Sequence, residues 1–123
     1  MKLLFLAIFS FIFTTNIFSQ DISSYIKTGN IHELAKQFEG NIELTLPSST
    51  GKVSKLSAEK KIKTFFQEHE GSDFKELHEG SADNIHYKIG LLETKKGVFN
   101  VTYYYKIRND KQIISSFSIE ASE

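Results

Sequence analysis

The chain of 123 residues contains no cysteine and no tryptophan, and it has a single proline. Without cysteine it has no disulfide, no thiolate metal ligand, no thiol nucleophile and no site for a lipid thioether. Charge of one sign is not in excess either, because 15 Lys and Arg balance 15 Asp and Glu. A balanced chain has no long-range attraction for nucleic acid or anionic lipid, so we expect no nucleic-acid partner.

Long apolar runs are missing except at the N-terminus. Lys2 precedes a mostly apolar run over residues 3–13, and small and polar residues follow. This order is typical of a secretory signal peptide. The alternative, a retained membrane anchor, needs a run of about 20 apolar residues. We therefore predict a signal peptide over residues 1–19, export to the periplasm or beyond, no membrane association after cleavage, and a single domain over 20–123.

In the part predicted to be exported, apolar residues recur with one of two spacings. A spacing near 3.6 residues predicts helices, and a spacing of two residues predicts strands. Asn30 and Glu33 have the spacing of a capping box, and Ser57 is placed to cap a later helix. We expect one helix from Asp21 to before Gly29, one from Asn30 to before Gly40, and one from Ala58 to about His69. We expect strands over 41–46, 53–56, 84–94, 98–107 and 112–120, with a weakly patterned one over 73–80.

The dipeptide Gly51-Lys52 is also found in phosphate-binding P-loops. A P-loop needs a glycine five positions earlier and a hydroxyl residue after the lysine. Those positions hold Leu46 and Val53, so we interpret the segment as a turn between two strands and expect no nucleotide.

Helix, short strand pair, helix and a meander of long strands follow one another over nearly all of the exported part. Characteristic residues within this order are Asp21-Ile22, Gly29-Asn30, Leu34-Ala35, Phe38, Ile42-Glu43-Leu44, Pro47, Ser54-Lys55, Ala58-Glu59 and Phe65-Phe66. The pattern resembles the nuclear transport factor 2-like (cystatin-like) α+β cone, and within it an uncharacterised family of small exported bacterial proteins known only as a domain of unknown function. The resemblance implies N-terminal helices packed on a strongly curved antiparallel sheet, often with a cavity at the open end and often with dimerisation through the sheet.

Enzymes on this cone, such as steroid isomerases and scytalone dehydratases, need a carboxylate or a His/Asp pair inside the cavity, with a tyrosine or an acid for the oxyanion. Glu43, Glu76 and Glu93 are not placed in the interior by the pattern, so we predict no catalytic residue. His86, on the strand face opposite Tyr87, is able to form a polar cavity wall with Tyr103 or Tyr105, and it is otherwise a structural histidine. The predicted ligand-binding residues are His86, Tyr103, Tyr105 and Ser115.

Metal binding is not predicted, because His69 and His78 lie nine positions apart across a helix end. No cofactor is expected. Tyr104, together with Val98 and Ile114, is predicted to form an apolar patch for a partner sheet. The alternative is a partly exposed sheet surface without a partner.

We therefore expect an exported small-molecule-binding or protein-interaction module without catalytic activity. Its expected partners are a small apolar ligand and a second copy of the chain through the sheet. The alternative is a cavity enzyme of the dehydratase or isomerase type. An acid that points into the cavity within reach of a histidine or tyrosine distinguishes the enzyme from the binding module.

Overall fold

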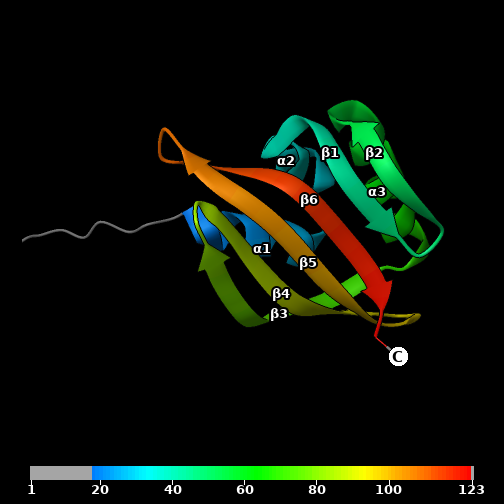
Figure 1. Cartoon of the computed structure of the whole chain (residues 1–123). Coiled ribbons are helices and arrows are strands. Elements are labelled where there is room, and N and C mark those ends of the chain that lie inside the picture. Colours follow the sequence, from blue (N-terminus) through cyan, green and yellow to red (C-terminus); the bar gives the residue numbers. More distant parts are fainter. Residues whose placement is uncertain (1–17, 123) are drawn as a thin grey trace, which may run out of the picture.

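The computed structural model describes residues 18–122, so the predicted signal peptide lies, apart from its last two residues, outside the described part (Figure 1). The elements are α1 (Phe18–Thr28), α2 (Ile31–Ala35), β1 (Phe38–Leu46), β2 (Ser49–Ser54), α3 (Lys55–Glu68), β3 (Gly71–Ala82), β4 (Ile85–Thr94), β5 (Gly97–Arg108) and β6 (Lys111–Ala121). None of the helices between residues 18 and 122 has the length and apolar character needed to cross a membrane.

The six strands form a single curved sheet in the order β2-β1-β6-β5-β4-β3. Neighbouring strands are antiparallel except β1 and β6, which run parallel. All three helices lie on one face, where α1 packs against β3, α3 packs against β1, and α2 contacts both other helices (Figure 1). We call this covered side the inner face and the opposite side the outer face. The predicted α+β class, with helices on a curved and mainly antiparallel sheet, is confirmed.

The helix boundaries follow local capping. The Asn30 side chain accepts a hydrogen bond from the Glu33 amide at 3.4 Å, as predicted. The cap of α3 was expected at Ser57, but Ser54 accepts from the Ser57 amide at 3.1 Å, so the helix begins three residues earlier. The turn predicted around Gly51 lies elsewhere in the structure, because Gly51 is inside the β1–β2 hairpin, where it pairs with Leu44.

The second predicted helix is too long. It ends at Ala35, and Phe38 starts β1 instead of closing the helical stripe. Phe38 pairs with Ile114 of β6 and its ring lies 6.0 Å from that of Phe117. Burial of this ring against the sheet outweighs the local helical pattern.

Strand β4 presents its less apolar side to the helices, which its sequence does not lead one to expect. Its more apolar set of residues, Ile85, Tyr87, Ile89 and Leu91, faces outward, and the set His86, Lys88, Gly90 and Leu92 faces the helices. Register fixes this orientation, because Leu92 pairs with the buried Phe99 of β5. Gly90 is required here, since a Cβ would lie 2.5 Å from the Phe74 ring that crosses over it. A polar stretch of β4 therefore comes to lie on the inner face.

Candidate functional site

The inverted strand brings three of the predicted ligand-binding residues together. His86 pairs with Tyr105, and Lys88 pairs with Tyr103, across β4 and β5. The rings of His86 and Tyr105 stack at 5.2 Å, and those of Tyr103 and Tyr105 are 6.0 Å apart. All four side chains lie on the inner face, where Tyr103 and Lys88 are buried.

Ser115, the fourth predicted residue, does not join them. Tyr104 pairs with Ser116 and Tyr105 pairs with Ile114, so Ser115 is the extra residue of a β-bulge and has no opposite partner. Nothing in the alternation of β6 marks this bulge, so sequence reasoning missed it.

A buried lysine is the centre of the arrangement. Lys88 is only 6% exposed, and its Nζ lies 3.6 Å from Glu76 Oε2 and 3.9 Å from Glu79 Oε1. Glu76 also accepts a hydrogen bond from the Ser23 hydroxyl of α1 at 3.1 Å. We call His86, Lys88, Tyr103 and Tyr105 with these two glutamates the inner-face cluster. Glu76 faces the inner side and its carboxylate reaches a buried lysine, although its own side chain is 34% exposed.

A second β-bulge explains how both glutamates reach one lysine. Residues three apart on a regular strand face opposite sides of the sheet. In β3, however, Glu76 pairs with Gly90 and Glu79 pairs with Lys88, with a register shift between Glu76 and His78. The extra residue, Leu77, resets the alternation, so both carboxylates face inward.

The Tyr103 hydroxyl is buried and makes no hydrogen bond of good distance and angle with residues 18–122, although Glu76 lies close enough to interact with it. Burial, and then the negative charge of Glu76, raise the pKa of Tyr103. Burial followed by the charges of Glu79 and Glu76 raises the pKa of Tyr105 as well. Both hydroxyls therefore keep their protons and act as hydrogen-bond donors near neutral pH.

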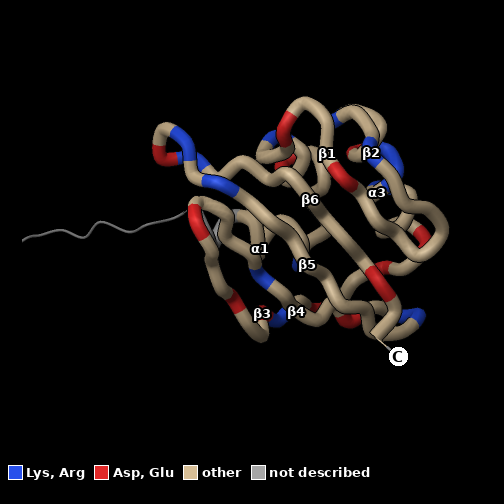
Figure 2. Tube along the Cα trace, viewed as in Figure 1, with Lys and Arg blue, Asp and Glu red and all other residues tan. Residues whose placement is uncertain are grey.

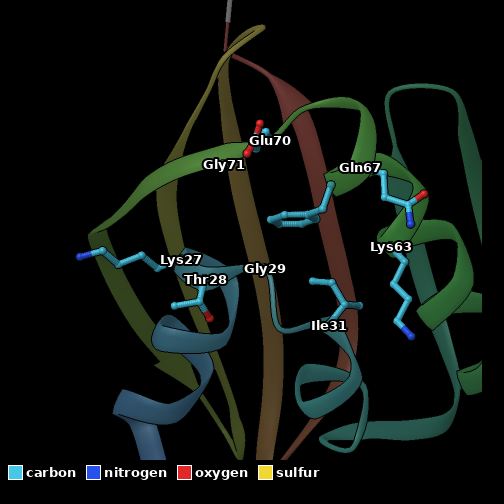
Figure 3. A pocket seen from close by; sticks show the side chains of 9 residues that line it. Lys27, Thr28, Gly29, Ile31, Lys63, Gln67, Glu70 and Gly71 are labelled. Atoms are coloured by element: carbon cyan, nitrogen blue, oxygen red, sulfur yellow. The ribbon is translucent and has the colours of Figure 1, made fainter.

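Two hollows lie near these elements. One of about 350 Å³ is lined by Glu76, Leu77, His78 and Glu79 at the bulge of β3. A larger one, of about 530 Å³, lies between the ends of α1 and α3 and is lined by Phe66, Ile31 and several polar residues. In Figure 3 the side chains of Lys27 and Lys63 point away from each other around this larger hollow. Because its charged groups diverge, the larger hollow offers no convergent chemistry, and the inner-face cluster is the better candidate.

The part of the chain that the structure describes has no group of His, Cys, Asp and Glu arranged to hold a metal ion. His69 instead stacks on Phe65 at 4.1 Å, with its Nδ1 2.9 Å from the Phe65 carbonyl oxygen. His78 lies on the outer face, 6.1 Å from the Tyr87 ring.

The predicted interface patch is only partly possible. Val98 and Tyr104 face outward and are 43% and 42% exposed, but Ile114 is fully buried in the core. The Ser115 bulge causes this difference, because it exchanges the faces of the residues before it. Ile113, which pairs with Lys106, faces outward in place of Ile114. The patch as predicted, with Ile114 as a member, is therefore wrong.

Comparison with known proteins gives a consistent picture. A family model described as a domain of unknown function (DUF4783) matches residues 19–120. The crystal structure of a DUF4783 family protein from Bacteroides uniformis is similar, with TM-score 0.79 and 25% identity over 86% of this chain and 98% of that one. One from Bacteroides ovatus has TM-score 0.77 and 25% identity, covering 83% and 93%. A designed nuclear transport factor 2-like protein shares the fold, with TM-score 0.65 and 12% identity over 81% and 90%. No curated protein matches.

Proposed function

The chain belongs to the DUF4783 family, a domain of unknown function with the nuclear transport factor 2-like fold, and we propose that it is a small-molecule-binding module. Its binding site is the inner-face cluster. The module works outside the cytoplasm, and the support for export is the N-terminal run at residues 3–13.

The buried Tyr103 hydroxyl carries this proposal. A buried polar group without a partner costs about 1–3 kcal/mol, and folded proteins rarely keep such groups without a reason. Lys88 adds to the argument, because its ammonium group has two carboxylates at 3.6 and 3.9 Å but no hydrogen bond to either. Two neighbouring donors whose contacts with the protein's carboxylates are long or poorly aligned favour a ligand that supplies an oxygen acceptor to both.

The ligand is expected to have an apolar, flat part as well as this oxygen. The stacked His86 and Tyr105 rings form an aromatic wall beside Tyr103. Aromatic rings with a few fixed polar groups are typical of small-molecule sites. The purely apolar ligand expected from the sequence is therefore modified to an amphipathic one.

Binding without catalysis is favoured because the Glu76 carboxylate is already engaged. Its Oε2 atom accepts from Ser23 and faces Lys88, so this oxygen is already occupied by groups of the protein. The second candidate function is a cavity enzyme of the dehydratase or isomerase type. The observation that favours it is the position of Glu76 beside the protonated Tyr103, which is a base next to a hydrogen-bond donor.

Native mass spectrometry of the exported form, purified gently from its own cell envelope, tests the proposal. The wild type is expected to carry a bound small molecule that Tyr103→Phe loses, because that substitution removes only the hydroxyl. Tyr104→Phe is the matched control on the outer face, and it is expected to keep the bound mass. Equal bound mass in both variants, or none in the wild type, contradicts the proposed site.

The same molecule, once identified, separates the two functions. Incubation with wild type is expected to return it unchanged. If the wild type converts the molecule, and if Glu76→Gln still binds it but no longer converts it, the protein is an enzyme instead.

A further inference from the structure

Lys88 has a chemical property that hydrogen bonding to a ligand does not use, because its amine is a nucleophile held away from water. It is the only buried lysine among residues 18–122. The side chains of Lys27, Lys63 and Lys95, which also form ion pairs, are 57%, 49% and 71% exposed. Lysines that form Schiff bases with carbonyl compounds are typically buried ones.

The Lys88 amine lies next to a hollow that opens to solvent. Its Nζ is 3.6 Å from Glu76 and 3.9 Å from Glu79, and both glutamates line the hollow of about 350 Å³ at the bulge of β3. Figure 2 shows red segments of β3 beside a blue segment of β4 in this part of the sheet. The Glu79 side chain is 72% exposed, so it is free to move into water and admit a ligand.

We propose that Lys88 holds its ligand covalently, as an imine formed with the carbonyl group of an aldehyde or ketone. This inference rests on the proposed function, since it names the chemical class of the ligand that the inner-face cluster binds. The carbonyl oxygen is the acceptor offered to both Lys88 and Tyr103. The stacked rings of His86 and Tyr105 favour a flat, conjugated group on the carbonyl carbon.

The reaction balances without a further reactant. Glu76 takes a proton from the Lys88 ammonium group, and the amine attacks the carbonyl carbon, so that a C–N bond forms while the π electrons of the C=O bond move to oxygen. The nitrogen gives up a second proton to the same oxygen, again through Glu76, and the C–O bond breaks to release water. The products are a protonated imine and one water molecule, and nothing is oxidised or reduced. Hydrolysis reverses these steps and returns the carbonyl compound unchanged.

The two glutamates support the imine as well as they support the free lysine. The ammonium group and the protonated imine carry the same positive charge, so the carboxylates attract both. The imine nitrogen has a single N–H where the ammonium group has three, and it therefore needs fewer acceptors. Lys88 makes no hydrogen bond to either carboxylate, which is a poor arrangement for an ammonium group and an adequate one for an imine.

Tyr103 is placed to polarise the carbonyl group. It pairs with Lys88 across β4 and β5, and both side chains interact with Glu76. Its buried hydroxyl has no acceptor of good geometry within residues 18–122, so it is available to donate to the carbonyl oxygen. That donation stabilises the negative charge that develops on the oxygen during attack.

Reductive trapping tests the proposal. The exported form is incubated with benzaldehyde and sodium cyanoborohydride, which reduces an imine to a stable secondary amine, and peptide mapping by mass spectrometry measures the labelling of each lysine. Lys88 is expected to be labelled about tenfold or more faster than Lys60, which is exposed on α3. Labelling of Lys88 that is no faster than that of Lys60 overturns the proposal.

Three variants separate the chemistry from a merely structural role, and circular dichroism checks that each is folded. Tyr103→Phe and Glu76→Gln are each expected to slow the labelling of Lys88 by about tenfold while that of Lys60 stays unchanged. Tyr104→Phe, on the outer face, is the control that leaves both rates unaltered. Rates at Lys88 that are equal in all variants contradict the roles assigned to Tyr103 and Glu76.

Reduction of the gently purified wild type distinguishes this proposal from the proposed function. Sodium cyanoborohydride is expected to fix the natural ligand, so that its mass remains on Lys88 after the protein is denatured. A mass that Tyr103→Phe loses, but that denaturation still releases from the reduced wild type, belongs to a non-covalent ligand. That outcome keeps the binding site and rejects the imine.

Discussion

At the scale of single residues, the protonation of the two inner-face tyrosines is the most direct consequence of the site. Burial and the nearby glutamates favour the neutral form of each phenol. A phenol whose pKa is raised in the folded state holds its proton after the unfolded chain has lost it. Its stabilising contribution is therefore complete below the unfolded pKa, near 10, and falls as the pH rises toward the folded pKa.

Alkaline titration is expected to show this effect. Wild-type unfolding free energy should decrease as the pH rises above 10, and Tyr105→Phe should reduce the decrease because one buried phenol is gone. Urea unfolding on either side of pH 10, with phenolate absorbance as a second readout, measures it. Tyr104→Phe, on the outer face, is the control. An unchanged slope in Tyr105→Phe contradicts the burial argument.

Sequence reasoning reached part of this site. Alternation placed Tyr103 and Tyr105 on one wall, and His86 was named as its possible third member although its strand alternates in favour of the opposite face. It missed Lys88, Glu76 and Glu79, because their meeting depends on the Leu77 bulge and on which face of β4 is covered. The polarity of β4 was a usable signal, since a lysine and a histidine alternate there with apolar residues.

At the scale of elements, the strong periodic segments were predicted and their ends were not. The strands β4, β5 and β6 and the helix α3 lie where the apolar periods indicate, although α3 is capped by Ser54 and not by Ser57. The segment 73–80 had weak alternation because the Leu77 bulge breaks it, yet β3 runs from Gly71 to Ala82. Phe38 shows a second limit of prediction from sequence. Its place in a strand and not in a helix depends on pairing with β6, which lies far away along the chain.

The helix α3 gives a stability prediction that separates two neighbouring phenylalanines. Phe65 is 5% exposed and its ring meets those of Phe99 at 5.1 Å and His69 at 4.1 Å, whereas Phe66 is only partly buried, at the edge of the larger hollow. Phe65→Ala should lower the unfolding free energy by about 3–5 kcal/mol. Phe66→Ala should cost about half as much, because less of the ring leaves water on folding.

Chemical denaturation of the two variants, measured side by side, checks this difference. Equal losses would mean that Phe66 is packed as tightly as Phe65. A loss below about 1 kcal/mol for Phe65→Ala would mean that α3 does not pack on the sheet as described.

At the scale of the whole molecule, one strand of the sheet departs from the usual arrangement of apolar residues inside and polar residues outside. The inner face of β4 holds a buried lysine, and its outer face holds exposed apolar residues. A buried charge and exposed apolar side chains both disfavour a stable isolated domain, and both occur within the ten residues of β4. In natural proteins such departures are concentrated at functional surfaces. The proposed binding site explains the first of these departures, the buried lysine on the inner face.

If Lys88 is kept for binding, its removal should not weaken the fold. Burial of an ammonium group costs several kcal/mol, and the two ion pairs at 3.6 and 3.9 Å are too long to offset that cost fully. The side chains of Glu76 and Glu79 are 34% and 72% exposed, so water solvates them when the lysine is gone. Lys88→Met, which keeps the apolar stem, is therefore expected to raise the unfolding free energy by about 1–2 kcal/mol and to abolish the bound mass. Urea unfolding with Lys60→Met as the control measures the first effect, and native mass spectrometry the second. A clear loss of stability in Lys88→Met would assign the lysine to the architecture of the sheet and leave the buried Tyr103 hydroxyl as the sole support for the binding site.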